Sequence, residues 1–104
     1  MNNVRYYKMS EKKLTNKKGK WQVTLLDDDV NSFDHVIECL MEICGHNYYQ
    51  AGQCATITHN MGRCSVFVDS YDECMDVFNE LLEEDICVMV HKYKEIHHDK
   101  KTNK

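Results

Sequence analysis

Three consecutive aspartates, Asp27, Asp28 and Asp29, follow an apolar segment and form the densest group of chemically active side chains. Carboxylates bind hard cations and accept hydrogen bonds, so the run suits a metal ion, phosphoryl chemistry or a cationic partner. A calcium loop needs alternating ligands and a closing glutamate, and this spacing is absent. Receiver-type phosphoryl pockets usually include a lysine, whereas Arg63 is the only basic residue between positions 21 and 90. We expect these aspartates to hold a partner; a solvated loop, a metal site and a phosphoryl site stay open as alternatives.

Cysteine and histidine are the other reactive residue types, with six of each. No two cysteines form a C-x-x-C pair, and most fall on the apolar phase of helical or strand patterns, which indicates small buried hydrophobes; a zinc or redox role is the alternative. His59 stands near a predicted helix end, where a cap or a surface group is the common role. No serine-hydrolase, phosphate-loop or zinc-protease motif is present. We therefore expect no enzyme, no bound metal and no cofactor.

Charge is strongly segregated along the 104 residues, although the net charge is only −4. Residues 21–90 contain fourteen acids and one basic residue, while lysines concentrate in 1–20 and 92–104. An acidic body repels nucleic acid, and lysine-rich polar ends are typical of solvated tails. No apolar run approaches the roughly 20 residues of a membrane helix, and the N-terminus lacks a signal sequence. We expect a cytoplasmic, monomeric domain over 21–91 with a flexible basic arm (1–20) and a disordered basic tail (92–104).

The periodicity of apolar residues predicts six elements in the order β-α-α-β-α-β. The strands are expected at 21–26, 64–68 and 86–90. The helices are expected between the Ser32 cap and Gly45, over about 48–58, and after a cap at Asp69 or Ser70. So few strands favour one compact α+β (broadly α/β) domain, with a three-stranded antiparallel sheet and three helices on one face.

The order and spacing of these segments resemble the ClpS family, the adaptors of the bacterial Clp protease. WQVTLLDDDVNSFDHVIECL is similar to the family's first strand, its N-D-D signature and its first helix. ATITHNMGRC is similar to the end of the second helix with the family's histidine, and DICVMV is similar to the last strand. The resemblance covers about 70 of 104 residues.

The resemblance implies a pocket for the first residue of a substrate protein. Asp27, Asp28, Asp29 and His59 would bind its α-amino group, which is mostly cationic near neutral pH. An apolar cavity would take its side chain, with lining residues Leu26, Asn31, Phe33, Ala55, Thr58 and Ile86. The family binds N-terminal Leu, Phe, Tyr or Trp and hands the protein to a Clp unfoldase of the AAA+ class.

Several positions depart from the family pattern. Asp27 replaces an asparagine, Phe33 and Ala55 replace methionines, and Thr58 replaces an apolar residue, so the cavity is expected to suit a differently shaped side chain. Asp72 and Asp76 fall on the helix that would dock the unfoldase, and this helix has no lysine. A diverged acidic interaction module without N-terminal residue recognition is therefore the alternative.

Overall fold

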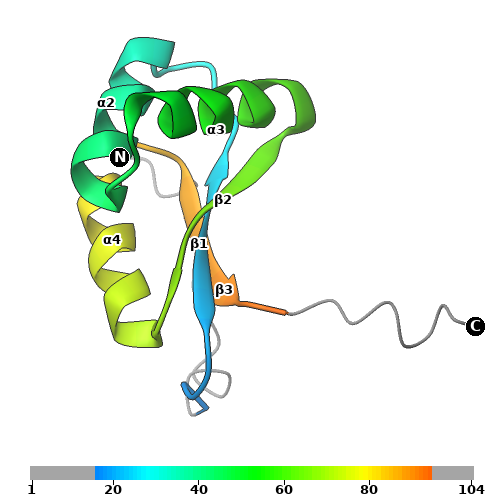
Figure 1. Ribbon diagram of the computed structural model, residues 1–104, viewed down its shortest axis with the longest axis vertical. Helices are drawn as coiled ribbons and strands as arrows, with labels where there is room; N and C mark the ends of the chain where they lie inside the picture. The colour runs from blue at the N-terminus through cyan, green and yellow to red at the C-terminus, as the bar shows by residue number, and fades with distance from the viewer. Residues whose placement is uncertain (1–15, 95–104) are drawn as a thin grey trace, which may run out of the picture.

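The computed structural model describes residues 16–94, which fold in the predicted order β-α-α-β-α-β (Figure 1). The elements are β1 (Trp21–Leu26), α2 (Phe33–Cys44), α3 (Tyr48–Met61), β2 (Arg63–Asp69), α4 (Tyr71–Glu83) and β3 (Val88–Lys92). The sheet has the order β2-β1-β3, and β1 is antiparallel to both neighbours. The predicted α+β fold with a three-stranded antiparallel sheet is confirmed.

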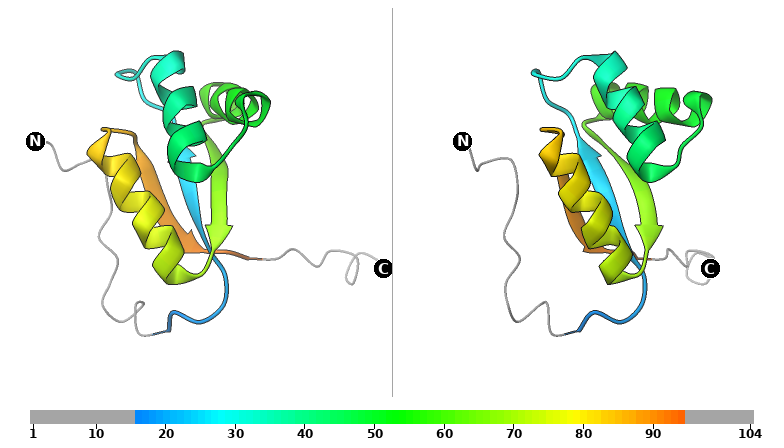
Figure 2. Two further views of the ribbon diagram at one scale, coloured as in Figure 1. Left: turned by 60° about the vertical axis from the view of Figure 1, so that its left-hand side comes forward. Right: turned by 90° about the vertical axis from the view of Figure 1, so that its left-hand side faces the viewer.

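The central strand β1 supplies the middle of the hydrophobic core. Its alternate residues Trp21, Val23 and Leu25 point to one face and are 0–3% exposed. On the same face, Val23 pairs with Val90 and Leu25 with Val88 of β3. Helix α4 lies across this face, while α2 and α3 pack together at one end of the sheet, where α3 contacts β2 (Figure 2). The C-terminal end of β1 therefore lies beside α2 and α3.

Local capping explains where the helices begin and end. Ser32, Asn47 and Ser70 cap α2, α3 and α4, and the side-chain oxygen of each accepts a backbone N–H three residues later. Gly45 and Gly62 end α2 and α3 in the left-handed conformation that glycine adopts without strain. Helix α3 continues to Met61, beyond the predicted end near position 58, because Gly62 is the first helix-ending residue in this stretch.

The end of α4 accounts for one error in the predicted strands. Asp85 adopts the left-handed conformation with φ 64°, and its N–H donates to the Leu82 carbonyl. The N–H of Ile86 donates to the Leu81 carbonyl, which completes a Schellman motif. Ile86 therefore belongs to the helix cap, and β3 starts at Val88 instead of Ile86.

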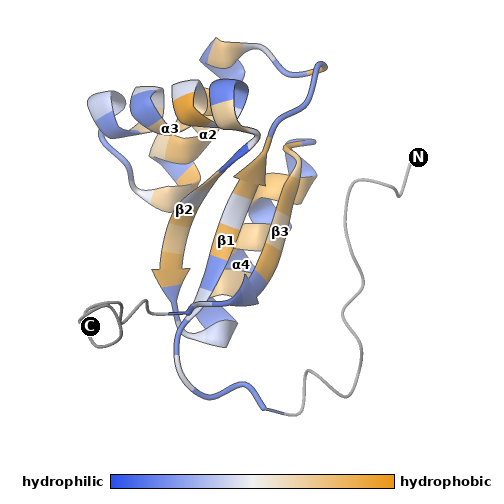
Figure 3. Ribbon diagram, turned by 90° about the vertical axis from the view of Figure 1, so that its right-hand side faces the viewer, coloured by the Kyte–Doolittle hydropathy of each residue, from blue (hydrophilic) through white to orange (hydrophobic). Residues whose placement is uncertain are grey.

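The opposite face of the sheet is not covered by any helix of residues 16–94 (Figure 3). On it, Thr24 Oγ1 lies 2.7 Å from His91 Nε2. Most of the predicted arm and tail lies outside the described residues. Lys17 and Lys20 from the end of that arm contact the domain: the Lys17 carbonyl accepts from the Trp21 indole, and the Lys20 carbonyl accepts from the Tyr93 N–H. Among the helices of this part of the chain, none is long and apolar enough to cross a membrane.

Candidate functional site

The aspartate run begins where β1 leaves the sheet, and backbone hydrogen bonds fix that point on both sides. The N–H of Leu26 donates to the Cys87 carbonyl at 2.8 Å, ahead of β3. The N–H of Asp27 donates to the Gly62 carbonyl at 3.1 Å, between α3 and β2. Asp27 is thereby held at the end of the sheet, beside the last turn of α3.

Asp28 organises the loop that leads into α2. Its Oδ1 accepts the backbone N–H groups of Val30 at 2.8 Å and Asn31 at 2.9 Å, and its Oδ2 accepts from Asn31 Nδ2 at 3.1 Å. The second N–H of the Asn31 amide donates to the Asp85 carbonyl at 2.9 Å. A carboxylate has about four acceptor positions, so Asp28 keeps roughly one for a ligand. The loop is therefore built around Asp28 and tied to the end of α4.

His59 lies in the last turn of α3 and faces both the aspartates and Phe33. Its Nδ1 is 3.9 Å from Asp27 Oδ1, which is too long for a direct hydrogen bond. Its ring makes an edge-to-face contact with the Phe33 ring, with centroids 5.8 Å apart and an interplanar angle of 78°. The Asp27 and His59 side chains are 44% and 65% exposed, so their polar atoms are open to a ligand from solvent.

A cavity of about 280 Å³ opens between these polar groups and the apolar residues of α2 and α3. Its lining residues are Leu25, Leu26, Asp27, Asp28, Asp29, Asn31, Phe33, Val36, Ala55, Thr58 and His59. Thr58 is buried, and its hydroxyl donates to the Cys54 carbonyl at 2.8 Å, so it leaves no unpaired donor in the cavity. The result is an acidic mouth joined to a mainly apolar wall.

The structure brings together nine of the ten residues expected at the pocket. Ile86 is the exception: it is 1% exposed in the core and does not line the cavity, and its N–H donates to the Leu81 carbonyl in the Schellman motif. Leu25 and Val36 line the cavity and were not anticipated. Val36 follows Phe33 by three residues on the same helix face, so helical spacing alone contained the signal for it.

The comparisons with known proteins bear on what this cavity is. Residues 16–98 match the family described as ATP-dependent Clp protease adaptor protein ClpS. The chain belongs to the ClpS family. An adaptor role is therefore its functional class. No curated protein sequence matches the chain.

Solved structures match as well. One is Agrobacterium tumefaciens ClpS2 bound to L-phenylalaninamide, with a TM-score of 0.62 and 16% sequence identity. The alignment covers 71% of this chain and 96% of that one. At this low identity the likeness shows a shared ClpS fold.

Two further groups of residues lie outside the cavity of this ClpS-family chain. Asp72 and Asp76 are exposed on α4 and do not line the cavity. None of the six cysteines, which all lie within residues 16–94, forms a disulfide; Cys39 and Cys74 are buried and the other four are half-buried. Burial raises the pKa of Cys44 to about 12, so its thiol stays protonated and unreactive at neutral pH. For most of the cysteines, packing is the role that the structure shows.

Proposed function

We propose that this chain is a non-enzymatic adaptor that binds proteins with a bulky hydrophobic or aromatic N-terminal residue and delivers them to a Clp-type AAA+ unfoldase. The observation that carries the proposal is the cavity, in which an acidic mouth continues directly into an apolar wall. An N-terminal residue of this kind has the same two parts: an ammonium group and, two bonds away, an apolar side chain.

The mouth suits an ammonium group in both charge and spacing. Asp27 Oδ1 and His59 Nδ1 are 3.9 Å apart, and a nitrogen between them reaches both at the roughly 2.7–2.9 Å of charge-assisted hydrogen bonds. The remaining acceptor position of Asp28 is available for the third N–H. A buried ammonium needs acceptors for its donors, since an unpaired buried charge is very costly. This arrangement is a form of N-terminal amine capture.

The wall suits one large side chain. The volume of about 280 Å³ is just below the roughly 300–1,000 Å³ typical of pockets for drug-sized ligands, and it exceeds that of several waters. Full burial of one such side chain contributes about 1.5–3 kcal/mol. Ordering costs offset part of this gain, so micromolar affinity is expected. The ClpS2 neighbour supports the same ligand class, since L-phenylalaninamide carries a free amine and an aromatic ring.

Fluorescence anisotropy with peptides that differ only at position one tests binding. We expect Phe, Leu and Trp peptides to bind in the micromolar range and Ser or Asp peptides to bind at least about tenfold more weakly, because only the first group fills the apolar wall. Equal affinity for all five peptides would contradict recognition of the N-terminal residue and would indicate a general interaction module.

Delivery is tested separately with a purified Clp unfoldase and protease. We expect the chain to accelerate degradation of a reporter that starts with Phe, and not of the same reporter starting with Ser. We further propose that the exposed carboxylates of Asp72 and Asp76 on α4 contribute to unfoldase docking. Replacing both with alanine should slow degradation while peptide affinity stays unchanged; unchanged degradation would place docking elsewhere.

A further inference from the structure

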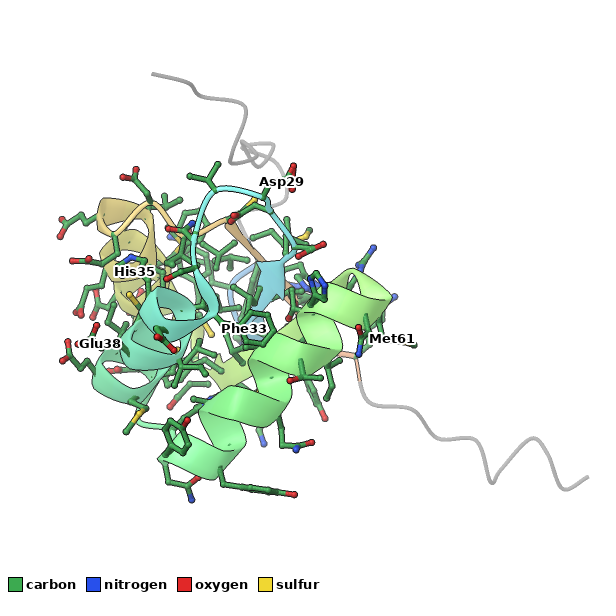
Figure 4. All side chains as sticks on the ribbon, turned by 90° about the horizontal axis from the view of Figure 1, so that it is seen from above. Asp29, Phe33, His35, Glu38 and Met61 are labelled. Carbon is green, nitrogen blue, oxygen red and sulfur yellow. The ribbon has the colours of Figure 1, made fainter. Side chains whose placement is uncertain are left out.

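A second group of ligand-type side chains lies on the other side of α2 from the cavity, where α2 meets the end of α4. His35 and Cys39 are four residues apart on α2 and so share one face of the helix. Glu84 is the C-cap of α4. One ligand atom from each of these three residues lies within 4.8 Å of the other two, and no other such His, Cys, Asp or Glu group occurs in residues 16–94. Figure 4 shows Phe33 between α2 and α3, and His35 on the side of α2 that faces α4.

We propose that His35, Cys39 and Glu84 form a site for a zinc-class metal ion that joins the first turns of α2 to the end of α4. Thiolate and imidazole together select a borderline-soft ion such as Zn²⁺ over Mg²⁺ or Ca²⁺, which prefer oxygen ligands only. Three protein ligands leave one tetrahedral position, which a water molecule would occupy.

The distances are close to those of a tetrahedral site. Zn–S of about 2.3 Å and Zn–N of about 2.0–2.1 Å place the sulfur and nitrogen ligands roughly 3.6 Å apart. Cys39 Sγ is 3.7 Å from His35 Nε2 and 3.9 Å from Nδ1. Glu84 Oε1 is 3.9 Å from His35 Nε2, and the Glu84 side chain is 51% exposed, so it has room to move a few tenths of an ångström. The separations need only small changes, but the His35 ring must also turn so that a nitrogen lone pair points at the ion, because Cys39 Sγ is nearly equidistant from its two nitrogens.

The surroundings also favour a cation. The three residues line a groove together with Glu38, Glu42, Glu80 and Glu83. The C-terminal end of α4 adds the negative pole of its helix dipole. Ser32 fixes the start of α2 by accepting the His35 N–H at 3.1 Å, and the Schellman motif fixes the end of α4. The three metal-ligand side chains therefore lie at two helix ends whose positions are fixed by hydrogen bonds.

A simpler role for His35 is to cap α4, because its Nε2 lies 3.1 Å from the Glu84 carbonyl oxygen. In that hydrogen bond the neutral ring carries its proton on Nε2, which leaves the lone pair of Nδ1 free. Nε2 is also the ring nitrogen within 4 Å of both Cys39 Sγ and Glu84 Oε1, so metal binding through Nε2 would replace this hydrogen bond and leave the ring proton on Nδ1. The cap does not explain Cys39, which is 5% exposed and still lines the groove beside the ring.

Metal binding requires the thiolate form of Cys39. The S–H bond breaks, the proton passes to water or buffer, and the sulfur donates an electron pair to the ion; no electron transfer and no other reactant is involved. Without metal, burial and then the charges of Glu84, Glu38 and Glu42 raise the pKa of Cys39 to about 11. The metal-free thiol is therefore a poor nucleophile, and the same carboxylates that stabilise its proton also attract a metal cation.

Cobalt titration of the full-length, untagged and reduced protein tests the site, because Co²⁺ bound to a thiolate gives a charge-transfer band. We expect one equivalent to produce this band together with tetrahedral d–d bands, and Zn²⁺ to displace it and raise Tm. Cys39→Ser should abolish the charge-transfer band. His35→Gln and Glu84→Gln should each weaken Zn²⁺ binding by roughly 10- to 100-fold, the effect typical of altering a metal's ligand shell.

Matched controls separate this site from the other cysteines and histidines. Cys44→Ser removes a half-buried thiol from the same helix and should keep the band and the Tm shift. His97→Gln with His98→Gln should also keep both. The proposal is overturned if the wild-type protein gives no thiolate band, if the band keeps its intensity in Cys39→Ser, or if Cys44→Ser loses it to the same extent. Because His35→Gln and Glu84→Gln change half-exposed or exposed side chains, they test the site even if Cys39→Ser misfolds.

Discussion

The two sides of α2 carry two acidic concavities that differ in what surrounds the acids. On one side, Asp27 and Asp28 adjoin an apolar wall that includes Phe33 and Ala55. On the other, Glu84 adjoins an imidazole and a thiol within a groove lined largely by glutamates. Negative charge alone would attract any cation to either side. The neighbouring residues decide the ligand: an apolar wall selects an ammonium group attached to a hydrophobic side chain, and soft ligand atoms select a bare metal ion.

The largest expected effect comes from Asp28, whose carboxylate both builds the loop and borders the cavity. Asp28→Ala should weaken binding of a Phe-starting peptide by roughly 100-fold and lower the free energy of unfolding by about 1–3 kcal/mol, because three hydrogen bonds are lost. Peptide titration and urea unfolding measure the two effects. Asp29→Ala, in the same loop, should change binding only a few-fold; equal effects of the two variants would contradict the organising role of Asp28.

A crossed pair of variants tests whether the two sides are independent. Asp27→Asn keeps the shape of the side chain but removes its charge. It should lower the affinity for the Phe-starting peptide by roughly 10-fold and leave the cobalt spectrum unchanged. Cys39→Ser should remove the cobalt charge-transfer band and leave peptide affinity unchanged. If each variant impaired the binding of both the peptide and cobalt, the two concavities would act as one site, which would contradict their independence.

The shape of the apolar wall is tested by filling it. Ala55→Met adds side-chain volume inside the cavity. It should lower the affinity for a Trp-starting peptide by about 10-fold and lower that for a Leu-starting peptide less, because the narrowed cavity excludes the larger side chain first. Ile57→Met changes an exposed residue of the same helix and should affect neither peptide. Identical losses for Trp and Leu would mean that the side chain does not enter this cavity.

The smallest expected effect is a pH dependence that arises on the uncovered face of the sheet. Burial lowers the pKa of His91 below its usual value, and the charge of Arg63 acts in the same direction. The folded state therefore favours neutral His91; this contribution is complete above about pH 6.5 and is lost as the pH falls through the lower folded value. Stability should fall less between pH 7 and pH 5 in His91→Gln than in the wild-type protein. Equal slopes in thermal unfolding would contradict this assignment.

The sequence predicted the elements well where local signals were strong. Alternation in 21–26 and the caps at Ser32 and Gly45 placed β1 and α2, whereas α3 runs to Met61, past its predicted end near position 58. Ile86 was misplaced because an apolar residue before a strand has the same pattern whether it pairs in the sheet or closes a helix. Only the backbone conformation of Asp85 distinguishes these cases, and a left-handed aspartate leaves no periodic signal.

The two sites differ in how many of their residues could be predicted from the sequence. The aspartates and His59 could be paired through the family resemblance, although the three hydrogen bonds that engage Asp28 depend on a turn that composition does not reveal. The spacing of His35 and Cys39 was visible as one helix face. Glu84 is 45 or more residues away along the chain, and only the packing of α4 against α2 brings it to them.

The most direct test of the ammonium site is a titration of the full-length protein with one Phe-starting peptide, free and N-acetylated, at pH 7. Acetylation keeps the aromatic side chain but removes the charge and two N–H donors, so the mouth would face an uncharged amide. We expect the acetylated peptide to bind at least roughly 100-fold more weakly than the free one, the scale of leaving a desolvated carboxylate without its charged partner. Affinities that agree within about threefold would contradict amine recognition by Asp27, Asp28 and His59.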